Sequence, residues 1–170
     1  MYLEIDKYDY YDESLLNTEK YLQHVFNVDY RTVNSNWKEG LESSFCQYGI
    51  DNRVYRWIDR YVESMKKNSV VVEFENIAID PGAIYESRDY LYIRAYVKYR
   101  ITADDINVPT NELVYGDYNN LKGLSNGKWN YEIFDIRIDS RYGNNDYQWG
   151  PTAQNLLSNW QYRESFKQED

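Results

Sequence analysis

The sequence is poor in the residues that build covalent cross-links and most metal sites, with one Cys and one His among 170 residues. Cys46 alone excludes an intramolecular disulfide and any site built from several cysteines, and we expect it to be a small buried residue near a helix end. Every Ser-His-Asp or Cys-His arrangement would depend on His24. The carboxylates show no ordered ligand spacing. The sequence therefore predicts neither a metal site nor a cofactor.

Long apolar runs and basic clusters are also missing. No window approaches the roughly 18 consecutive apolar residues of a transmembrane helix, so the chain as it stands has no predicted membrane insertion. Nor does the N-terminus have the sequence of a secretion signal. We expect a cytoplasmic protein, or a protein of the cell envelope if the chain has been trimmed of an export or anchor segment. The net charge of −9 argues against nucleic acids and anionic membranes as partners, because both bind clustered Lys and Arg.

Tyrosine is what the sequence has in excess, at 20 of its 170 residues. An aromatic share of 18% in a chain of this length favours one folded domain over disorder. Residues 1–13 are acidic and rich in Tyr, and we interpret them as an N-terminal arm. A single domain is then expected over 14–162, followed by a charged C-terminal tail over 163–170.

Apolar residues recur at helical intervals in the first part of the chain. After an N-cap at Asp12 or Ser14, the first stripe predicts helix as far as Gly49, with a break near 27–36. A second stripe predicts another helix that ends at the cations of 66–67. The stripes consist of Leu15, Leu22, Phe26, Val33, Trp37, Leu41 and Phe45, and of Val54, Trp57, Ile58, Tyr61, Val62 and Met65.

From Val70 onward the apolar period changes to two, which is typical of strands. In the first and last predicted strands, the apolar residues change face after Phe74 and after Ile133. A β-bulge has this effect, because one extra residue inverts every side chain that follows it. Two bulges predict a strongly bent sheet that curls around the helices. The predicted strands are 70–79, 90–101, 113–118 and 129–138, followed by a polar loop over 140–150 and a short helix from Pro151.

The polar face of the second strand is the strongest candidate for an interaction surface. It carries Tyr90, Tyr92, Arg94, Tyr96 and Lys98. Tyrosine is enriched at protein interfaces because it buries a large area and loses little side-chain entropy. The alternative is that these rings cover the sheet beneath a helix or loop, and that an AT-rich genome raises the Tyr content. Stacking on single-stranded nucleic acid is disfavoured, because the chain is acidic and has no basic groove.

The order of elements, helices first and then a bulged antiparallel sheet, resembles the NTF2-like superfamily. The likeness covers roughly 15–140 and is greatest to VirB8 and the TcpC-type conjugation proteins. It implies an α+β fold whose N-terminal helices pack on a strongly bent antiparallel sheet of about four strands, the NTF2-like cone. It also implies a non-enzymatic assembly module that self-associates or docks other protein subunits of a conjugation or secretion machine at the cell envelope. That branch has no catalytic residues to carry over.

Two alternatives remain open. In NTF2-like enzymes a His, Asp or Tyr lies between the helices and the concave sheet face, and such a pocket binds a small ligand or performs acid–base chemistry. Candidates here are His24, Asp29 and Tyr30, facing Tyr131. The aromatic residues that would fill the cone instead are Trp37, Trp57, Phe74 and Trp129. The other alternative is an acidic accessory or inhibitor protein of a mobile element, since the net charge suits a basic partner.

Overall fold

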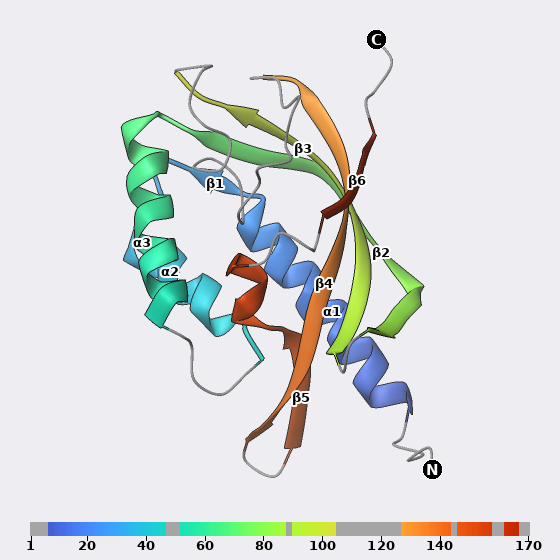
Figure 1. Cartoon of the computed structure of the whole chain (residues 1–170). Coiled ribbons are helices and arrows are strands. Elements are labelled where there is room, and N and C mark those ends of the chain that lie inside the picture. Colours follow the sequence, from blue (N-terminus) through green and yellow to red (C-terminus); the bar gives the residue numbers. More distant parts are fainter. Residues whose placement is uncertain are drawn as a thin grey trace.

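A strongly curled antiparallel sheet follows the N-terminal helices along the chain (Figure 1). The computed structural model describes residues 7–46, 52–87, 90–104, 127–143, 146–157 and 162–166. The fold is α+β, as predicted. Its elements are α1 (Lys7–Val25), β1 (Val28–Asp29), α2 (Ser35–Ser43), α3 (Asn52–Lys67), β2 (Val71–Ser87), β3 (Tyr90–Thr102), β4 (Trp129–Gly143), β5 (Asp146–Pro151), the 3-10 helix η2 (Ala153–Leu157) and β6 (Tyr162–Phe166).

The sheet is built around β3 and β4. Its strand order is β1-β2-β3-β4-β5, and β6 pairs with β4 as well. The register of β3 and β4 is unbroken from the pair Leu91 and Ile138 to the pair Arg100 and Trp129. Residues of β3 and β4 that face each other across this ladder therefore lie on the same side of the sheet.

The helices match the apolar stripes, with corrections at their ends. The predicted break is confirmed, because β1 and a turn separate α1 from α2, and the Asn34 side chain caps α2 by accepting a hydrogen bond from the Trp37 N–H at 3.2 Å. However, α1 begins at Lys7, within the segment expected to be an arm, so Asp12 and Ser14 lie inside the helix and do not cap it. The second helix is confirmed as α3, whereas α2 ends at Ser43.

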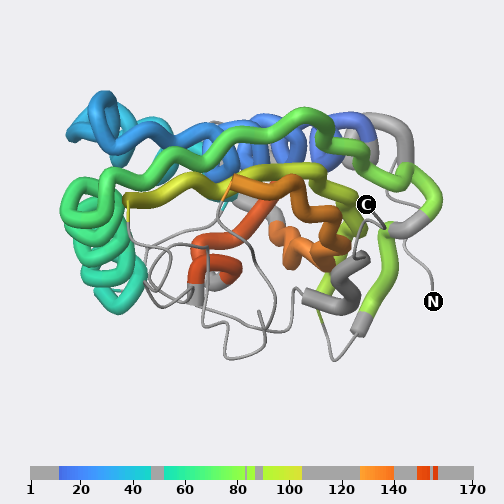
Figure 2. Tube along the Cα trace, turned by 90° about the horizontal axis from the view of Figure 1, so that it is seen from above, coloured from blue at the N-terminus to red at the C-terminus, as the bar shows by residue number. Residues whose placement is uncertain are grey.

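The core lies between the helices and one face of the sheet, which we call the inner face. The ring of Phe26, directly after α1, lies 4.8 Å from the ring of Tyr99 and 5.4 Å from that of Phe134, measured between centroids. Burial of such rings is the main favourable contribution to folding. Figure 2 shows α1 and α2 along one side of the sheet. Fully buried core residues include Tyr21, Leu22, Leu41, Ile58, Met65, Ile93, Ile136 and Leu156.

The predicted bulge in the first strand is confirmed in β2. Phe74 pairs with Tyr99 and Asn76 with Lys98, so Glu75 is the extra residue. The bulge keeps the later apolar residues of β2 on the inner face. A second irregularity follows between Ile79 and Ile84. The strand predicted to end at residue 79 continues beyond it, and β2 resumes pairing with β3 at Ile84.

The predicted bulge in the last strand is wrong for β4. Its register with β3 runs without a shift through Ile133 and Phe134. A shift does occur opposite β6, where residue 163 is the extra residue. The sequence pattern changes face for another reason: Trp129 and Tyr131 lie on the outer face, away from the helices, and Glu132 takes the inner position between them.

The C-terminal part is more regular than expected. Residues 140–143 and 146–150 lie in strands instead of the expected loop, because β4 extends to Gly143 and pairs with β5. The short helix after Pro151 is confirmed as η2. Residues 163–166, expected in the charged tail, belong to β6. The predicted strand 113–118 lies outside the described residues. None of the described helices is both long and apolar enough to cross a bilayer.

Candidate functional site

The outer face of the sheet carries cross-strand rows of an acid, a base and an aromatic residue. In the first row the register places Arg100 between Glu73 and Trp129. The Nε of Arg100 donates to Oε1 of Glu73 at 2.6 Å, and the guanidinium carbon lies 4.8 Å from the Trp129 ring centroid. The cation is therefore held by an ion pair on one side and a cation–π contact on the other.

The second row is centred on Lys98 and depends on the bulge in β2. The bulge places both Glu75 and Asn76 opposite Lys98, and the Glu75 carboxylate is ion-paired with the Lys98 ammonium. The Nζ of Lys98 also lies 5.0 Å from the ring centroid of Tyr131 and 5.5 Å from that of Trp129. The hydrogen bond that Lys98 donates to the Glu75 carboxylate, followed by its hydrogen bond with the Tyr131 hydroxyl, raises the pKa of Lys98 above its ordinary value.

A pocket of about 360 Å³ lies next to this second row. Tyr96 stands beside it with 42% of its surface exposed, and its cross-strand neighbours are the small Ala78 and the half-buried Ile133. The pocket thus combines aliphatic and aromatic walls with one fixed ion pair. Its lining residues are Glu75, Asn76, Tyr96, Val97, Lys98, Tyr131, Glu132 and Ile133.

The predicted interaction surface is exposed only in part. Tyr96 and Lys98 lie at the pocket, and Tyr90 is 40% exposed at the far end of β3. Tyr92 is 4% exposed and stacks on Tyr85 with a centroid distance of 5.5 Å, so its assignment to an exposed surface is wrong. Tyr92 thus covers the sheet together with Tyr85 of the neighbouring strand β2.

Arg94, the remaining residue of that predicted surface, forms an ion pair with Asp135 of β4. Its Nε donates to Oδ1 of Asp135 at 2.9 Å, and Asp135 is almost fully buried. This hydrogen bond raises the pKa of Arg94. Sequence reasoning missed the contributions of Trp129 and Tyr131 to the outer face, because their alternation with Ile133 was attributed to a bulge.

The four candidates for acid–base chemistry do not meet. The Nε2 of His24 donates to the backbone oxygen of Trp37 at 2.8 Å, and the two rings stack. The Asp29 carboxylate in β1 accepts a hydrogen bond from Arg31, which lowers the pKa of Asp29, and Tyr30 lies beside the Arg31 guanidinium. Tyr131 is on the outer face of the sheet with Lys98. No shared site joins these residues.

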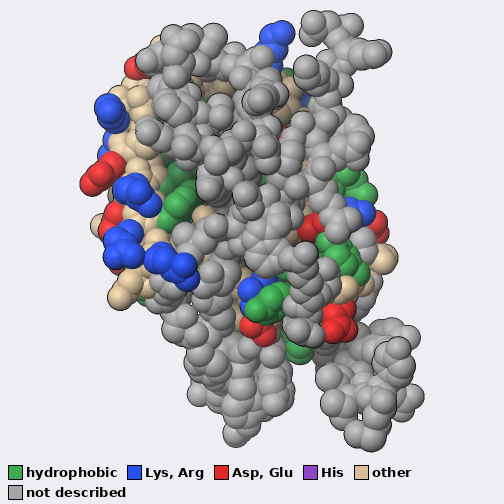
Figure 3. Space-filling model, viewed as in Figure 1, with side chains coloured by type: hydrophobic (Ala, Val, Ile, Leu, Met, Phe, Trp, Pro, Cys, Tyr) green, Lys and Arg blue, Asp and Glu red, His purple; other side chains and the backbone are tan. Residues whose placement is uncertain are grey.

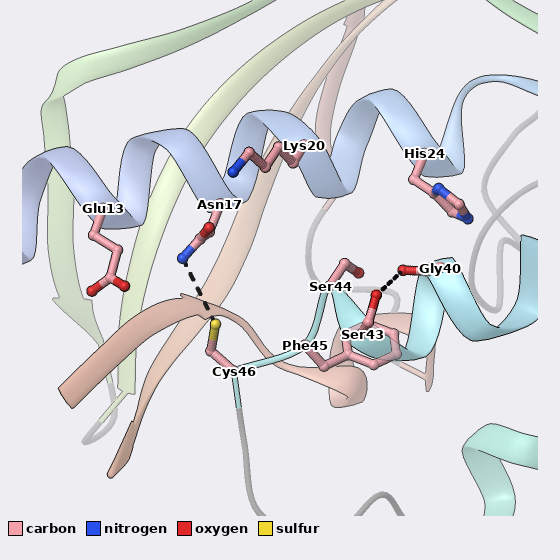
Figure 4. Close-up of a pocket in the computed structure, with 9 residues that line it drawn as sticks. All are labelled: Glu13, Asn17, Lys20, His24, Gly40, Ser43, Ser44, Phe45 and Cys46. Atoms are coloured by element: carbon pink, nitrogen blue, oxygen red, sulfur yellow. Dashed lines mark hydrogen bonds between the residues drawn. The ribbon is translucent and has the colours of Figure 1, made fainter. Parts of the chain in front are cut away.

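His24 does line a second pocket, of about 370 Å³, between α1 and α2 (Figure 4). Asn17 at this pocket donates from Nδ2 to the backbone oxygen of Trp149 at 2.7 Å. Cys46 is buried three residues after α2, as expected, but Figure 4 shows His24 and Cys46 toward opposite ends of the pocket. A nucleophile–base pair is therefore not formed. Across the described ranges, no three His, Cys, Asp or Glu side chains gather to hold a metal ion.

The inner face holds one buried acid that sequence reasoning missed. Glu132 is 3% exposed and lies opposite Val97, diagonal to Tyr99. Burial raises its pKa from the ordinary 4.5 to about 7, and a hydrogen bond from the Tyr99 hydroxyl opposes that shift. Of the four aromatic residues considered as filling for the cone, three pack against the core and Trp129 does not. The three are Trp37, Trp57 and Phe74.

Comparison with known proteins gives no match: no family model, no curated protein and no solved structure resembles this chain closely enough to count as one.

Proposed function

We propose that this protein is a non-enzymatic binding module that docks a partner protein on the outer face of its sheet. The observation that carries the proposal is the exposed ring of Tyr96 at a pocket that the ion pair of Lys98 and Glu75 also lines. A pocket of this kind suits an aromatic or branched aliphatic side chain of the partner. Polar residues that flank this side chain in the partner would then contact the ion pair of Lys98 and Glu75 at the rim of the pocket.

The composition and rigidity of the outer face support this proposal. Tyr, Trp and Arg dominate the energetics of protein interfaces, and the outer face presents Tyr96, Trp129 and Arg100 on paired strands. The cations are already held by carboxylates and rings, so little side-chain entropy remains to be lost on binding. A site on a sheet is also better fixed than a site on a loop.

The scattering of the acid–base candidates favours binding over catalysis. His24, Asp29 and Tyr131 each contact a different neighbour, on different elements. Within the proposal, the NTF2-like and VirB8-type resemblance suggests that the partner is another subunit of a conjugation or secretion machine at the cell envelope.

Affinity capture with matched tyrosine variants tests this function. The whole chain, Tyr96→Ala and Tyr55→Ala are used as baits in extracts of the organism that encodes the protein. Tyr55 is a suitable control because it is 39% exposed on α3 and does not line the pocket. We expect one protein to be retained by the wild type and by Tyr55→Ala and depleted on the order of tenfold by Tyr96→Ala, which corresponds to about 1.4 kcal/mol. Equal retention by all three baits would refute the site.

A second candidate function is acid–base or small-ligand chemistry on the inner face, and Glu132 is the observation that favours it. A buried carboxyl that titrates near neutrality beside a Tyr hydroxyl is a feature of some active sites. A screen of small ketones and carboxylic acids by thermal shift, with Glu132→Gln as the control, tests this candidate. A ligand that stabilises the wild type and not Glu132→Gln would support it; stabilisation of both variants or of neither would not.

A further inference from the structure

The helix α3 is basic in an acidic protein. Its 16 residues carry five cations and two carboxylates, a net charge of +3, whereas the whole chain carries −9, so the other residues share −12. One of the two carboxylates, Asp59, is ion-paired with Lys38 of α2. The excess positive charge of α3 is therefore not balanced within the helix.

Three of these cations follow one line along α3. Arg56, Arg60 and Lys67 are separated by four and seven residues, which places them on one side of an α-helix, and all three are exposed. We call these three residues the basic stripe. Figure 3 shows Lys and Arg side chains gathered over α3 at the left of the view. Glu63 lies on the same side by its spacing, and the stripe still keeps a surplus of two positive charges.

The apolar side of α3 is not available for binding. Val54, Ile58 and Met65 are buried in the core. A basic amphipathic helix whose apolar face is free suits a membrane surface, but here only the charged side remains. The stripe therefore fits a partner that supplies carboxylates.

A matching negative charge lies in the first residues of the same sequence. Residues 1–13 contain five carboxylates and one Lys, a net charge of −4. The helix α1 starts at Lys7, and the start of α1 lies at the opposite end of the molecule from α3 in both views (Figures 1 and 2). Oppositely charged regions at opposite ends of a molecule favour contacts between copies over contacts within one copy. They are placed to attract each other between molecules.

We propose that the basic stripe of α3 binds the acidic segment 1–13 of a second copy, so that the chain associates head to tail. The contact is heterologous, because the two surfaces differ, and it forms open chains unless the rotation between copies closes a ring. The contact uses surfaces separate from the pocket beside Tyr96. A negative result for self-association would therefore leave the proposed docking function untouched, and the reverse is also true.

Sedimentation velocity of the whole chain at low ionic strength, where the Debye length is about 30 Å, tests the proposal. We expect the sedimentation coefficient of the wild type to rise with protein concentration and to return to the monomer value near 1 M salt, where that length is about 3 Å. The double variant Arg56→Glu with Arg60→Glu should weaken association by on the order of tenfold or more. So should Asp9→Lys with Asp12→Lys, which changes the net charge of the segment from −4 to 0. Lys128→Glu, an exposed cation outside α3, is the control and should associate like the wild type.

Mixing the two double variants is the decisive step. Each retains one of the two surfaces intact, so the acidic segment of the first can bind the basic stripe of the second. We expect a complex of two molecules that grows no further with concentration, from two variants that are monomeric alone. Circular dichroism spectra equal to that of the wild type show that both variants are folded.

The outcomes show whether the chain self-associates and whether the basic stripe is the surface that it uses. A wild type that stays monomeric at low ionic strength, or a mixture of variants that gives no complex, overturns the proposal. If Arg56→Glu with Arg60→Glu associates as strongly as the wild type, then self-association uses another surface and the proposal is likewise wrong. Association abolished by both double variants and restored by mixing supports it.

Discussion

A Cβ atom added at Gly40 would lie 2.7 Å from Cε1 of His24, so α2 crosses the end of α1 where only glycine fits without movement. We expect Gly40→Ala to lower the free energy of unfolding by about 1–3 kcal/mol, the usual cost of overpacking. The ring of His24 would have to move and would lose its hydrogen bond to Trp37. Urea unfolding measures the change.

A double-mutant cycle measures the coupling between Gly40 and His24. In a His24→Ala background the added methyl group has no ring to meet, so Gly40→Ala should cost less there than in the wild type. An equal cost in both backgrounds would show that Gly40 is needed for another reason.

Glu132 makes the stability of the protein depend on pH. Its folded pKa of about 7 lies above the ordinary 4.5, so the folded state holds a proton that the unfolded state releases. This contribution is complete below about pH 4.5 and is lost as the pH rises through 7, on the order of 3 kcal/mol in total. Glu132→Gln should remove this component and gain stability relative to the wild type at pH 8. Parallel curves of unfolding free energy against pH for both proteins would contradict this assignment.

The ion pair of Arg94 with Asp135 should matter more than that of Lys38 with Asp59. The Asp135 side chain is 2% exposed and the Asp59 side chain 60%. Loss of charge at a buried pair leaves the partner uncompensated, whereas an exposed pair is screened by water. We expect Asp135→Asn to cost about 2–3 kcal/mol and Asp59→Asn less than about 1 kcal/mol. Chemical denaturation of both variants would reveal the difference; similar small costs would mean that Asp135 is not desolvated.

Asn155 of η2 completes the backbone pairing of β4. Its Oδ1 accepts from the Arg137 N–H at 3.0 Å, and its Nδ2 donates to the Arg137 carbonyl at 2.8 Å. Asn155→Ala would remove the side-chain acceptor of the Arg137 N–H, while the Arg137 carbonyl still accepts from the Thr152 N–H at 3.1 Å, and we expect a loss of about 1–3 kcal/mol. Asn130→Ala removes only a local, exposed bond to Lys128 and is the control, with an expected change within about 0.5 kcal/mol. Equal losses of stability for Asn155→Ala and Asn130→Ala would contradict this role of Asn155.

The parts of the fold that follow a strict apolar period could be predicted from the sequence. The stripe from Val54 to Met65 gave α3, and the change of face after Phe74 gave the bulge at Glu75, because both patterns record which side chains are buried. The same reasoning failed at β4. There Trp129 and Tyr131 are held on the outer face by cations, and Glu132 takes a core position that apolar patterning does not anticipate.

The site was only partly predictable for a related reason. Tyr96 and Lys98 were identified from their alternation along one strand, but the pocket needs Glu75 from β2 and Tyr131 from β4. Cross-strand neighbours depend on register, and the register of β2 depends on where the bulge lies. The burial of Tyr92 likewise depends on Tyr85, which joins β3 only after the irregularity at Asp80.

Photo-crosslinking from the pocket tests whether a partner protein docks on the outer face in the cell. Benzoylphenylalanine is placed at position 96 in one protein and at position 55 in another, and both are irradiated in living cells of the organism that encodes the chain. We expect a discrete crosslinked protein from position 96 that is absent from position 55 and reduced when Lys98→Ala is added. Crosslinks that are equal at the two positions, or none at position 96, would contradict a docking site on the outer face.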